Sequence, residues 1–441
     1  MTDPRSPGLA ERHDPEQSGR RMHDLCRELF PLVRSITGAG VRRTLDMVGR
    51  SLPLDRHEVP SGTPVLDWTV PPEWNVSEAW VAGPDGRRVV DLADSSLHVM
   101  SYSVPIRARM PLADLRPHLH TLPDRPTWVP YRTSYYNPDW GFCLRHDVSE
   151  SLPDGEYEVV IDASLEAGSL SYAECLIPGQ LDDEVLVTTH VCHPSLANDN
   201  LSGIALLTEL GAALSAVPLR YSYRLLFIPG TIGSITWLDR NPEAVAKVRH
   251  GVVVSGVGDP GAFTWKRSRR GDTEIDRVMT HVLGASGADH NLIDFYPYGY
   301  DERQFCSPGF DLPVGRFGRT PHHEYPEYHT SGDDLDFVRP ERLSESLAMV
   351  LAAVDVLEGN RRYQNLAPRG EPQLGRRGLY RSIGGDVDNK AVELALLWVL
   401  NLSDGDHSLL DVAERSGLPF GVVARAAERL EEHELLRRLD P

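Results

Sequence analysis

Two short segments of this chain concentrate side chains that can bind metal ions and move protons. The first, residues 188–203, reads TTHVCHPSLANDNLSG and contains His190 and Asp199. The second, residues 321–336, contains three histidines, of which His329 is the last, among several carboxylates. Neutral imidazole nitrogens and carboxylate oxygens are both ligands that suit zinc. The two segments together therefore predict a site for one divalent metal ion.

Each segment follows a predicted strand and precedes a predicted helix. Apolar runs rich in Val, Leu and Ile predict strands at residues 184–189, 223–228, 250–255 and 312–317, and helical spacing predicts helices at 201–213 and 340–357. Continuous apolar strands separated by helices are typical of a largely parallel sheet that is buried on both faces. Because the carboxyl ends of such strands lie along one edge, we expect His190 and His329 to meet there.

Composition changes along the chain and predicts an α/β protein of several domains. Residues 1–19 are rich in Pro, Arg, Asp and Glu, which predicts a disordered tail. Residues 59–151 hold five tryptophans and many prolines, which indicates an all-β domain inserted into a core formed by 20–58 and 152–362. Residues 363–385 resemble a linker. Residues 386–441 contain helical segments around a Gly-containing turn and are typical of a winged helix-turn-helix.

The net charge and the hydropathy of the chain argue against nucleic acid and membranes as partners. The 64 acidic and 45 basic residues give a net charge of −19, and residues 403–435 are also acidic, so nucleic acid is an unlikely partner. The apolar stretches are shorter than the roughly 20 residues that a membrane span needs. Five widely spaced cysteines without a CxxC pair argue against a disulfide framework. We expect a cytoplasmic protein with no membrane partner, and a homo-oligomer stays open.

The motifs resemble those of known proteins. The run His190–Gly203, which ends in Asn-Asp-Asn-x-Ser-Gly, and the run Tyr328–Asp333 look like the metal-binding segments of the zinc aminopeptidases, a superfamily that includes glutaminyl cyclases. Further motifs resemble a family of uncharacterised aminopeptidase-like proteins; they are Trp68–Val76, Tyr131–Tyr136, Trp140–Cys143, His193–Asn200, Asp301–Gly309 and Glu324–Ser331. The resemblance covers roughly residues 20–440. It implies a zinc-aminopeptidase-like core, an inserted β domain and a C-terminal winged helix.

Carried over to this chain, the resemblance implies that His190, Asp199 and His329 hold one zinc ion. Aminopeptidases place a Glu-Glu pair after the next strand, one carboxylate serving as general base and the other as ligand. Here that turn contains Gly230, which can neither bind a metal nor move a proton. The aspartate expected after the following strand is also missing, and the nearest carboxylate is Asp259. A second metal ion is therefore not expected.

Another loop must then supply the group that transfers protons. The candidates are Asp301, Glu302, Glu324 and Glu327, which lie in loops predicted to gather at the same sheet edge. We favour Glu302 as the catalytic acid and base, since residues 299–304 lie between core strands and combine carboxylates with Arg303. The alternative is that Glu302 and Arg303 form a structural ion pair. Four residues are expected to contact the substrate: Asp301, Arg303, Glu324 and Tyr328.

Three hypotheses about function follow. The leading one is a zinc-dependent hydrolase of aminopeptidase type, which cleaves an amide beside a free amino group in a small molecule or short peptide. In the second, the core has lost catalysis, as Gly230 suggests, and the protein is a binding or scaffold module. In the third, a single metal ion supports acyl transfer or cyclisation.

Overall fold

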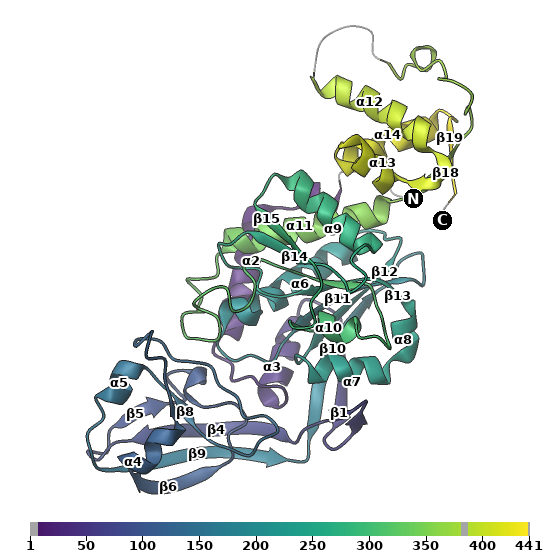
Figure 1. The fold of residues 1–441 in the computed structure, drawn as a ribbon. Helices are drawn as coiled ribbons and strands as arrows, with labels where there is room; N and C mark the ends of the chain where they lie inside the picture. Colours follow the sequence, from purple (N-terminus) through teal and green to yellow (C-terminus); the bar gives the residue numbers. More distant parts are fainter. Residues whose placement is uncertain (1–7, 381–386, 440–441) are drawn as a thin grey trace. The chain divides into compact units, whose positions relative to one another are not determined.

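The structure is a computed structural model that describes residues 8–380 and 387–439 (Figure 1). Its contacts divide the chain into two compact units. The larger unit comprises residues 14–276 and 289–347, and the smaller one comprises the described parts of residues 1–13, 277–288 and 348–441.

The larger unit is built on an eight-stranded sheet in the order β1-β10-β12-β11-β13-β16-β14-β15. The strands are β1 (Asp55–Pro60), β10 (Ser169–Ile177), β11 (Glu184–His190), β12 (Ser222–Ile228), β13 (Val248–Val254), β14 (Phe263–Lys266), β15 (His290–Ile293) and β16 (Val314–Gly318). The central strands β12, β11, β13 and β16 run parallel, while β1, β10 and β14 pair antiparallel toward the edges. Every residue of β11 and β12 is buried, which explains the apolar runs at residues 185–187 and 225–228 within them.

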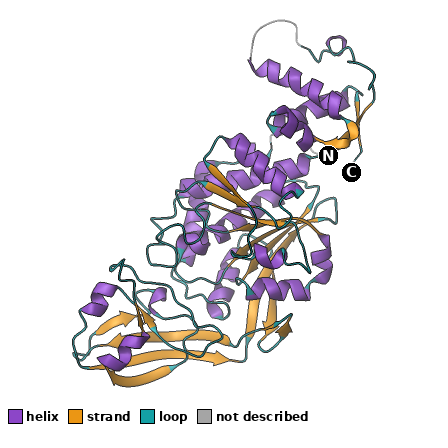
Figure 2. Ribbon diagram, viewed as in Figure 1, coloured by secondary structure: helices purple, strands orange, loops and turns teal. Residues whose placement is uncertain are grey.

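Helices lie on both faces of this sheet (Figure 2). Those of the larger unit are α2 (Pro15–Leu29), α3 (Ala39–Val48), α6 (Ser202–Ser215), α7 (Ile232–Arg240), α8 (Pro242–Lys247) and α10 (Glu302–Phe305), while α9 (Glu274–Ser286) and α11 (Pro340–Gly359) continue into the smaller unit. The predicted core strands and helices agree with β11, β12, β13, β16, α6 and α11 to within two residues at each end. The expected α/β core is confirmed.

The inserted β domain is also present, but it is longer than predicted. Its main sheet has the order β5-β4-β9-β6. The elements are β2 (Pro64–Val65), β3 (Trp68–Thr69), β4 (Glu73–Ala82), β5 (Arg88–Asp91), β6 (Ile106–Pro111), β7 (Leu119–His120), β8 (Phe142–Cys143), β9 (Glu156–Glu166), α4 (Leu112–Leu115) and α5 (His146–Glu150). Because β9 pairs with β4 from Glu158 to Glu166, the domain extends past residue 151 to the end of β9. The sequence of β9 predicts a strand but not the sheet that it joins.

The predicted tail is structured over its described part, residues 8–19. These residues contain α1 (Leu9–Arg12) and the start of α2, and residues 1–7 lie outside the described structure. Asp14 caps α2 by accepting a hydrogen bond from the backbone N–H of Gln17. Gly19 is buried against the carbonyl of Pro340, where a Cβ atom would lie 2.4 Å from the oxygen. The polar residues of the predicted tail therefore belong in part to a helix that Asp14 caps and that is buried on one side.

The smaller unit contains a winged helix-turn-helix that begins earlier than predicted. Its helices are α12 (Val387–Leu402), α13 (Leu409–Ser416) and α14 (Phe420–Glu432), and its strands are β17 (Arg362–Asn365), β18 (Asp404–Ser408) and β19 (Leu436–Arg438). Strand β17 is the middle strand of this sheet, so residues 363–365 belong to the domain and not to a linker. Residues 381–386 of the predicted linker lie outside the described structure. The short polar strand β17 gains its partners only when β18 and β19 fold beside it.

Two expectations about the whole chain can be compared with the structure. All five cysteines are buried free thiols, in agreement with the absence of a disulfide framework. Within the described residues, each helix is either too short or too polar to cross a lipid bilayer.

One partly buried ion pair joins the core to the inserted domain. Arg42 on α3 donates to both carboxylate oxygens of Glu73, the first residue of β4. Glu73 also accepts a hydrogen bond from the backbone N–H of Ser169, where β10 begins. The hydrogen bonds from Arg42, which outweigh the effect of burial, lower the pKa of Glu73 from 4.5 to about 2.

We predict that Glu73→Gln lowers the free energy of unfolding by about 1 kcal/mol at neutral pH, since the pair is partly exposed. A carboxyl group whose pKa is lower in the folded state stabilises the fold above its unfolded pKa. This contribution should therefore be lost as the pH falls from about 4.5 toward 2. Urea unfolding across this range measures it. The control is Glu28→Gln, which removes an exposed ion pair with Arg50; an equal effect of both substitutions would contradict the prediction.

Candidate metal centre

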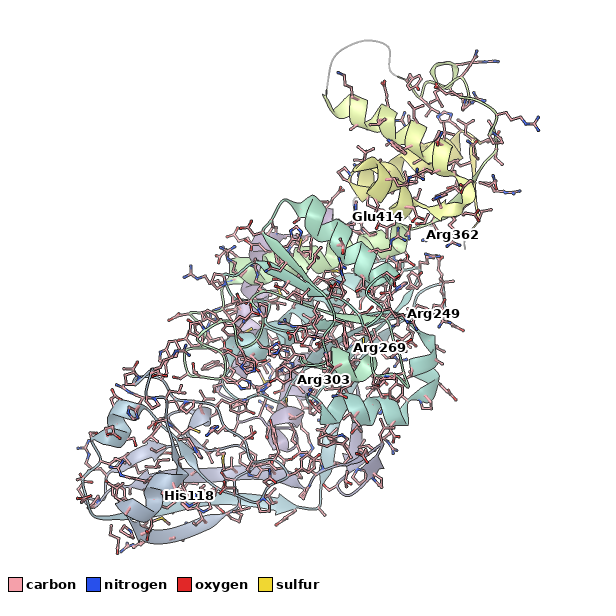
Figure 3. All side chains as sticks on the ribbon, viewed as in Figure 1. His118, Arg249, Arg269, Arg303, Arg362 and Glu414 are labelled. Atoms are coloured by element: carbon pink, nitrogen blue, oxygen red, sulfur yellow. The ribbon has the colours of Figure 1, made fainter. Side chains whose placement is uncertain are left out.

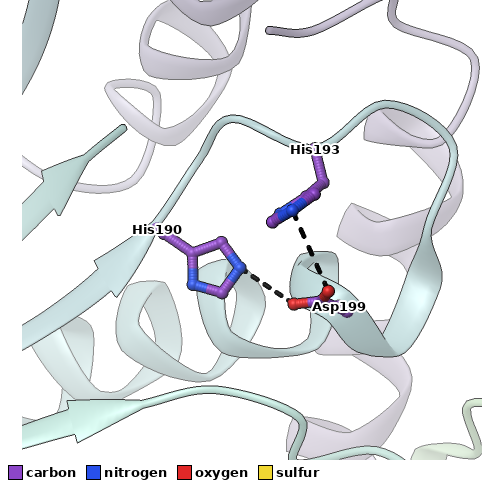
Figure 4. A group of neighbouring side chains, drawn as sticks. All are labelled: His190, His193 and Asp199. Carbon is purple, nitrogen blue, oxygen red and sulfur yellow. Dashed lines mark hydrogen bonds and ion pairs between the residues drawn. The ribbon is translucent and has the colours of Figure 1, made fainter. Parts of the chain in front are cut away.

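Three imidazole rings converge on the carboxylate of Asp199. His190 is the last residue of β11, and its Nε2 lies 2.9 Å from Oδ1 of Asp199. Nε2 of His329 lies 3.0 Å from Oδ2, and Nε2 of His193 lies 4.0 Å from the same oxygen. Figure 4 shows His190 and His193 directed at Asp199 from the same loop. The structure thus brings together the three predicted ligands and adds His193.

The backbone around Asp199 is fixed by a buried carboxylate from another loop. Asp333 accepts hydrogen bonds from the backbone N–H groups of Asn198 at 2.5 Å and Asp199 at 2.9 Å. Burial raises the pKa of Asp333 well above its ordinary value, although these two hydrogen bonds oppose the shift. The loop that carries Asp199 is therefore attached to the loop that carries His329.

Two asparagines complete this support. The side chain of Asn198 accepts from the N–H of Gly258 and donates to Asp259. The side chain of Asn200 donates to Thr189 and to the carbonyl of His190. Asp259, the carboxylate nearest to the missing aspartate, thus holds Asn198 in place. The Asn-Asp-Asn motif supplies one carboxylate to the site and two amides that position it.

The inserted domain fixes the segment around His329. The N–H of Tyr131 donates to the carbonyl of His329 at 2.8 Å, and Val129 and Ser331 exchange two more hydrogen bonds. His329 has a φ of +55°, which is uncommon outside glycine and is held here by these contacts. The ring of Tyr131 also meets the rings of His193 and His329 edge-on, at centroid distances of 5.3 and 5.0 Å. The insert is therefore part of the site.

The charges at this site favour a cation. Asp199 is fully buried, and no lysine or arginine pairs with it in the part of the chain that the structure describes. Burial alone would raise its pKa, but His193, His190 and His329 together lower the pKa well below its ordinary value. Burial lowers the pKa of His193 to about 3, so this ring is neutral at neutral pH. An ionised carboxylate surrounded by imidazole nitrogens fits the ligand set of zinc.

His193 is the ligand candidate that the sequence interpretation missed. The ligand atoms of His190, His193 and Asp199 lie within 4.8 Å of one another. The signal was present as two histidines three residues apart directly after a strand. The resemblance to aminopeptidases implied only His190 of these two histidines as a ligand.

The two carboxylates of the loop at residues 299–304 have different environments. Glu302 is fully buried and forms an ion pair with Lys266 at 2.9 Å. Asp301 instead accepts hydrogen bonds at Oδ1 from the N–H of Thr231 at 2.7 Å and the hydroxyl of Ser234 at 2.9 Å. Burial raises the pKa of Asp301, and the largest opposing effect comes from His190. Asp301 therefore contacts the turn at Thr231 and Ser234, whereas Glu302 contacts Lys266.

The position of Gly230 explains how Asp301 relates to the missing Glu-Glu pair. A Cβ atom on Gly230 would lie 3.5 Å from Sγ of Cys192 and 3.8 Å from Cβ of His190, so a side chain here would face the site. Asp301 binds the backbone of the next residue, Thr231. A carboxylate from a distant loop thus reaches the turn where the aminopeptidases carry theirs. Burial raises the pKa of Cys192 to about 12, so its thiol stays protonated.

The remaining predicted substrate contacts are only partly gathered at the site. The ring of Tyr328 stacks on His329 at a centroid distance of 3.9 Å. Glu324 is exposed on the same loop. Arg303, labelled in Figure 3, is half-buried on α10, and its Nε has no hydrogen-bond partner among the described residues. The expected alternative, an ion pair between Glu302 and Arg303, is replaced by the pair of Glu302 with Lys266.

A family model described as a domain of unknown function, DUF4910, matches residues 23–360. The chain belongs to this family. A second model, described as winged helix-turn-helix, matches residues 361–438 and therefore includes β17, as the structure does. The DUF4910 domain covers the core, the inserted domain and all the site residues described above.

Relatives of this DUF4910 protein extend over nearly its whole length. A Clostridium acetobutylicum protein, provisionally named as a polysaccharide biosynthesis protein with an aminopeptidase-like domain, is 49% identical over 421 residues, which are 96% of this chain and 97% of the relative. A crystal structure of a protein from the same organism, provisionally described as a peptidase, has a TM-score of 0.92 at 47% identity, and the match covers 96% of this chain and 97% of that one.

A more distant likeness concerns the fold alone. A zinc aminopeptidase from Bacillus subtilis is 16% identical, with a TM-score of 0.56, and the match covers 76% of this chain and 94% of that one. The core of this DUF4910 protein therefore has the fold of a zinc aminopeptidase, as the sequence resemblance predicted.

We predict that the wild-type protein binds about one zinc ion per chain and that Asp199→Ala abolishes this binding. His193→Ala should weaken zinc binding as well, because it removes one of the nitrogens directed at the site. Elemental analysis after dialysis against zinc measures the content. The matched control is His118→Ala, since His118 stacks on Trp140 in the inserted domain. Equal zinc content in wild type and His193→Ala would show that His193 is not a ligand.

Proposed function

We propose that this protein is a metal-dependent amide hydrolase of aminopeptidase type, which acts on a small molecule or short peptide with a free amino group beside the scissile bond. The observation that carries the proposal is the convergence of three imidazole nitrogens on the buried, ionised carboxylate of Asp199. The zinc-aminopeptidase fold of the core supports it. Cytoplasmic location belongs to the same proposal.

Asp199 and the three histidines would hold one zinc ion. When bound there, zinc supplies a Lewis acid that polarises the substrate carbonyl and lowers the pKa of a water molecule. Tyr131 and Tyr135 come from the inserted domain, and their hydroxyl oxygens lie 3.2 Å apart. Burial raises the pKa of both, so the hydroxyls stay protonated and can donate hydrogen bonds to a substrate oxygen.

Asp301 is the residue that we propose as proton acceptor, in place of Glu302. Both hydrogen bonds of Asp301 fall on Oδ1, which leaves Oδ2 without a partner in the described structure. Burial raises its pKa toward the range in which a carboxylate accepts a proton from water and returns it to a leaving amine. The carboxylate of Glu302 is instead neutralised by Lys266.

The name of the Clostridium relative suggests a second substrate class. That protein is named for polysaccharide biosynthesis, and an acylated amino sugar also contains an amide that a single metal ion could hydrolyse. Tyr300 stacks on His190 and Tyr328 on His329, so aromatic rings border the site. Aromatic faces pack well against the apolar faces of sugars. An N-acetylated amino sugar therefore belongs in the substrate panel beside aminoacyl amides and their N-acetylated counterparts.

We predict that Asp301→Asn lowers kcat for an aminoacyl amide by about 10²- to 10⁴-fold while zinc content stays unchanged. Glu302→Gln should leave kcat within about tenfold of wild type and lower stability, because it leaves Lys266 buried without a countercharge. Steady-state kinetics and thermal unfolding of the zinc-loaded variants measure both effects. Full activity in Asp301→Asn would exclude this role. A wild-type protein that binds zinc and hydrolyses none of the panel would favour acyl transfer or cyclisation, and one that binds no zinc would favour a scaffold.

A further inference from the structure

A buried arginine beside the site has no carboxylate partner. Arg316 lies on β16 and is 3% exposed. Its Nε donates to the hydroxyl of Ser255 and its Nη2 to the carbonyl of Ser255, both at 3.0 Å. Its Nη1 has no partner in the described structure and is not among the fully enclosed atoms. Nη1 is therefore the guanidinium nitrogen that remains available to a ligand.

Other buried arginines of the larger unit are fully paired. Arg224 binds the carboxylates of Glu174 and Glu184, and Arg319 binds Glu345. Arg34 has no carboxylate, but all three of its guanidinium nitrogens donate to backbone carbonyls. Burying a charge is costly unless it is paired and hydrogen-bonded. Arg316 is thus an exception among these arginines.

A buried lysine next to Arg316 in the sheet already has a carboxylate partner. Lys266 on β14 lies directly opposite Arg316 on β16, so both side chains leave the same face of the sheet. Lys266 pairs with Glu302, and its ammonium also lies 3.8 Å from the centre of the Tyr296 ring. Lys266 is therefore paired with a carboxylate in the described structure, and Arg316 is not.

Aromatic contacts connect Arg316 to the metal centre. The guanidinium lies 4.8 Å from the centre of the Tyr300 ring, and Tyr300 stacks on His190 at 5.2 Å. The ring of His322 meets Tyr300 edge-on at 5.0 Å, and its buried Nδ1 has no hydrogen-bond partner in the described part of the chain. Arg316 thus places an open nitrogen beside the tyrosine that contacts a proposed metal ligand, whereas the nitrogen of His322 is enclosed.

We propose that Arg316 binds a carboxylate of the substrate. The inference rests on the proposed function and adds to it the class of substrate: a short peptide, or a similar amide, that carries a free carboxylate in addition to its amino group. A guanidinium makes strong, directional hydrogen bonds to a carboxylate. A bound substrate carboxylate would then provide the countercharge that Arg316 lacks in the described structure.

The test compares two ligands that differ only in this charge, L-alanyl-L-alanine and L-alanyl-L-alaninamide. Their binding to zinc-free protein is measured by calorimetry, and their kcat/KM values are measured on zinc-loaded protein. Wild type should prefer the free acid about 10- to 100-fold in both assays, since a hydrogen bond to a charged group contributes about 1.5–3 kcal/mol. Arg316→Met should lose this preference, mainly through a higher KM, and Arg316→Lys should keep part of it.

Arg319→Met is the matched control. It removes a buried arginine three residues farther along that pairs with Glu345. It should leave the preference for the acid unchanged even if it lowers stability. A wild type without preference, or an equal loss for both ligands in Arg316→Met, would overturn the proposal and make Arg316 a support for Tyr300.

The two assays separate this proposal from the proposed function. Preferential binding of the acid by wild type, lost in Arg316→Met, would support the carboxylate site even if neither ligand is hydrolysed. Hydrolysis of both ligands with equal kcat/KM in wild type and Arg316→Met would support the hydrolase and reject the carboxylate site.

Discussion

The structure of this site depends on one fully buried carboxylate. Asp199 carries its charge without a lysine or arginine partner in the described structure, and in a medium of low polarity such a charge has to be compensated. Three imidazole rings and a fixed backbone provide part of that compensation, and a metal ion would provide the rest. The support from Asp333 is consistent with this, because its hydrogen bond holds the backbone of Asp199 while the Asp199 carboxylate faces the three rings.

The same requirement explains the role of the inserted domain. His329 belongs to a loop with an uncommon backbone conformation, and hydrogen bonds from Val129 and Tyr131 attach that loop to the inserted domain. Tyr131 then places its ring against two of the histidines. A domain that looks from its sequence like an independent β unit therefore supplies one wall of the site. Its long strand β9 leads directly into β10 of the core, so the two parts share a continuous backbone at their junction.

The carboxylates and cations around the site have partners that the sequence does not reveal. Gly230 occupies a position that faces His190, and Asp301 binds the next residue along the chain. Glu302, its neighbour in sequence, is directed to Lys266. Asp301 and Glu302 are adjacent in sequence but have different partners. Asp301 binds the turn beside Gly230, and Glu302 is the countercharge of Lys266. Arg316, opposite Lys266, is left with an open edge toward the same aromatic group.

Apolar periodicity and contiguous motifs are local properties of the chain, so the sequence alone predicts the α/β core, the inserted domain and the winged helix. It also predicts His190, Asp199 and His329 as metal ligands, and the structure brings these three side chains together. It predicted a disordered tail, a domain end at residue 151 and a linker from residue 363, where the structure has α2, β9 and β17. These three segments depend on tertiary contacts, since a short polar helix or strand is stabilised by partners distant in sequence. It also decided the partners of Asp301, Glu302 and Arg316, because which charges pair in a buried site depends on loops that meet only after folding.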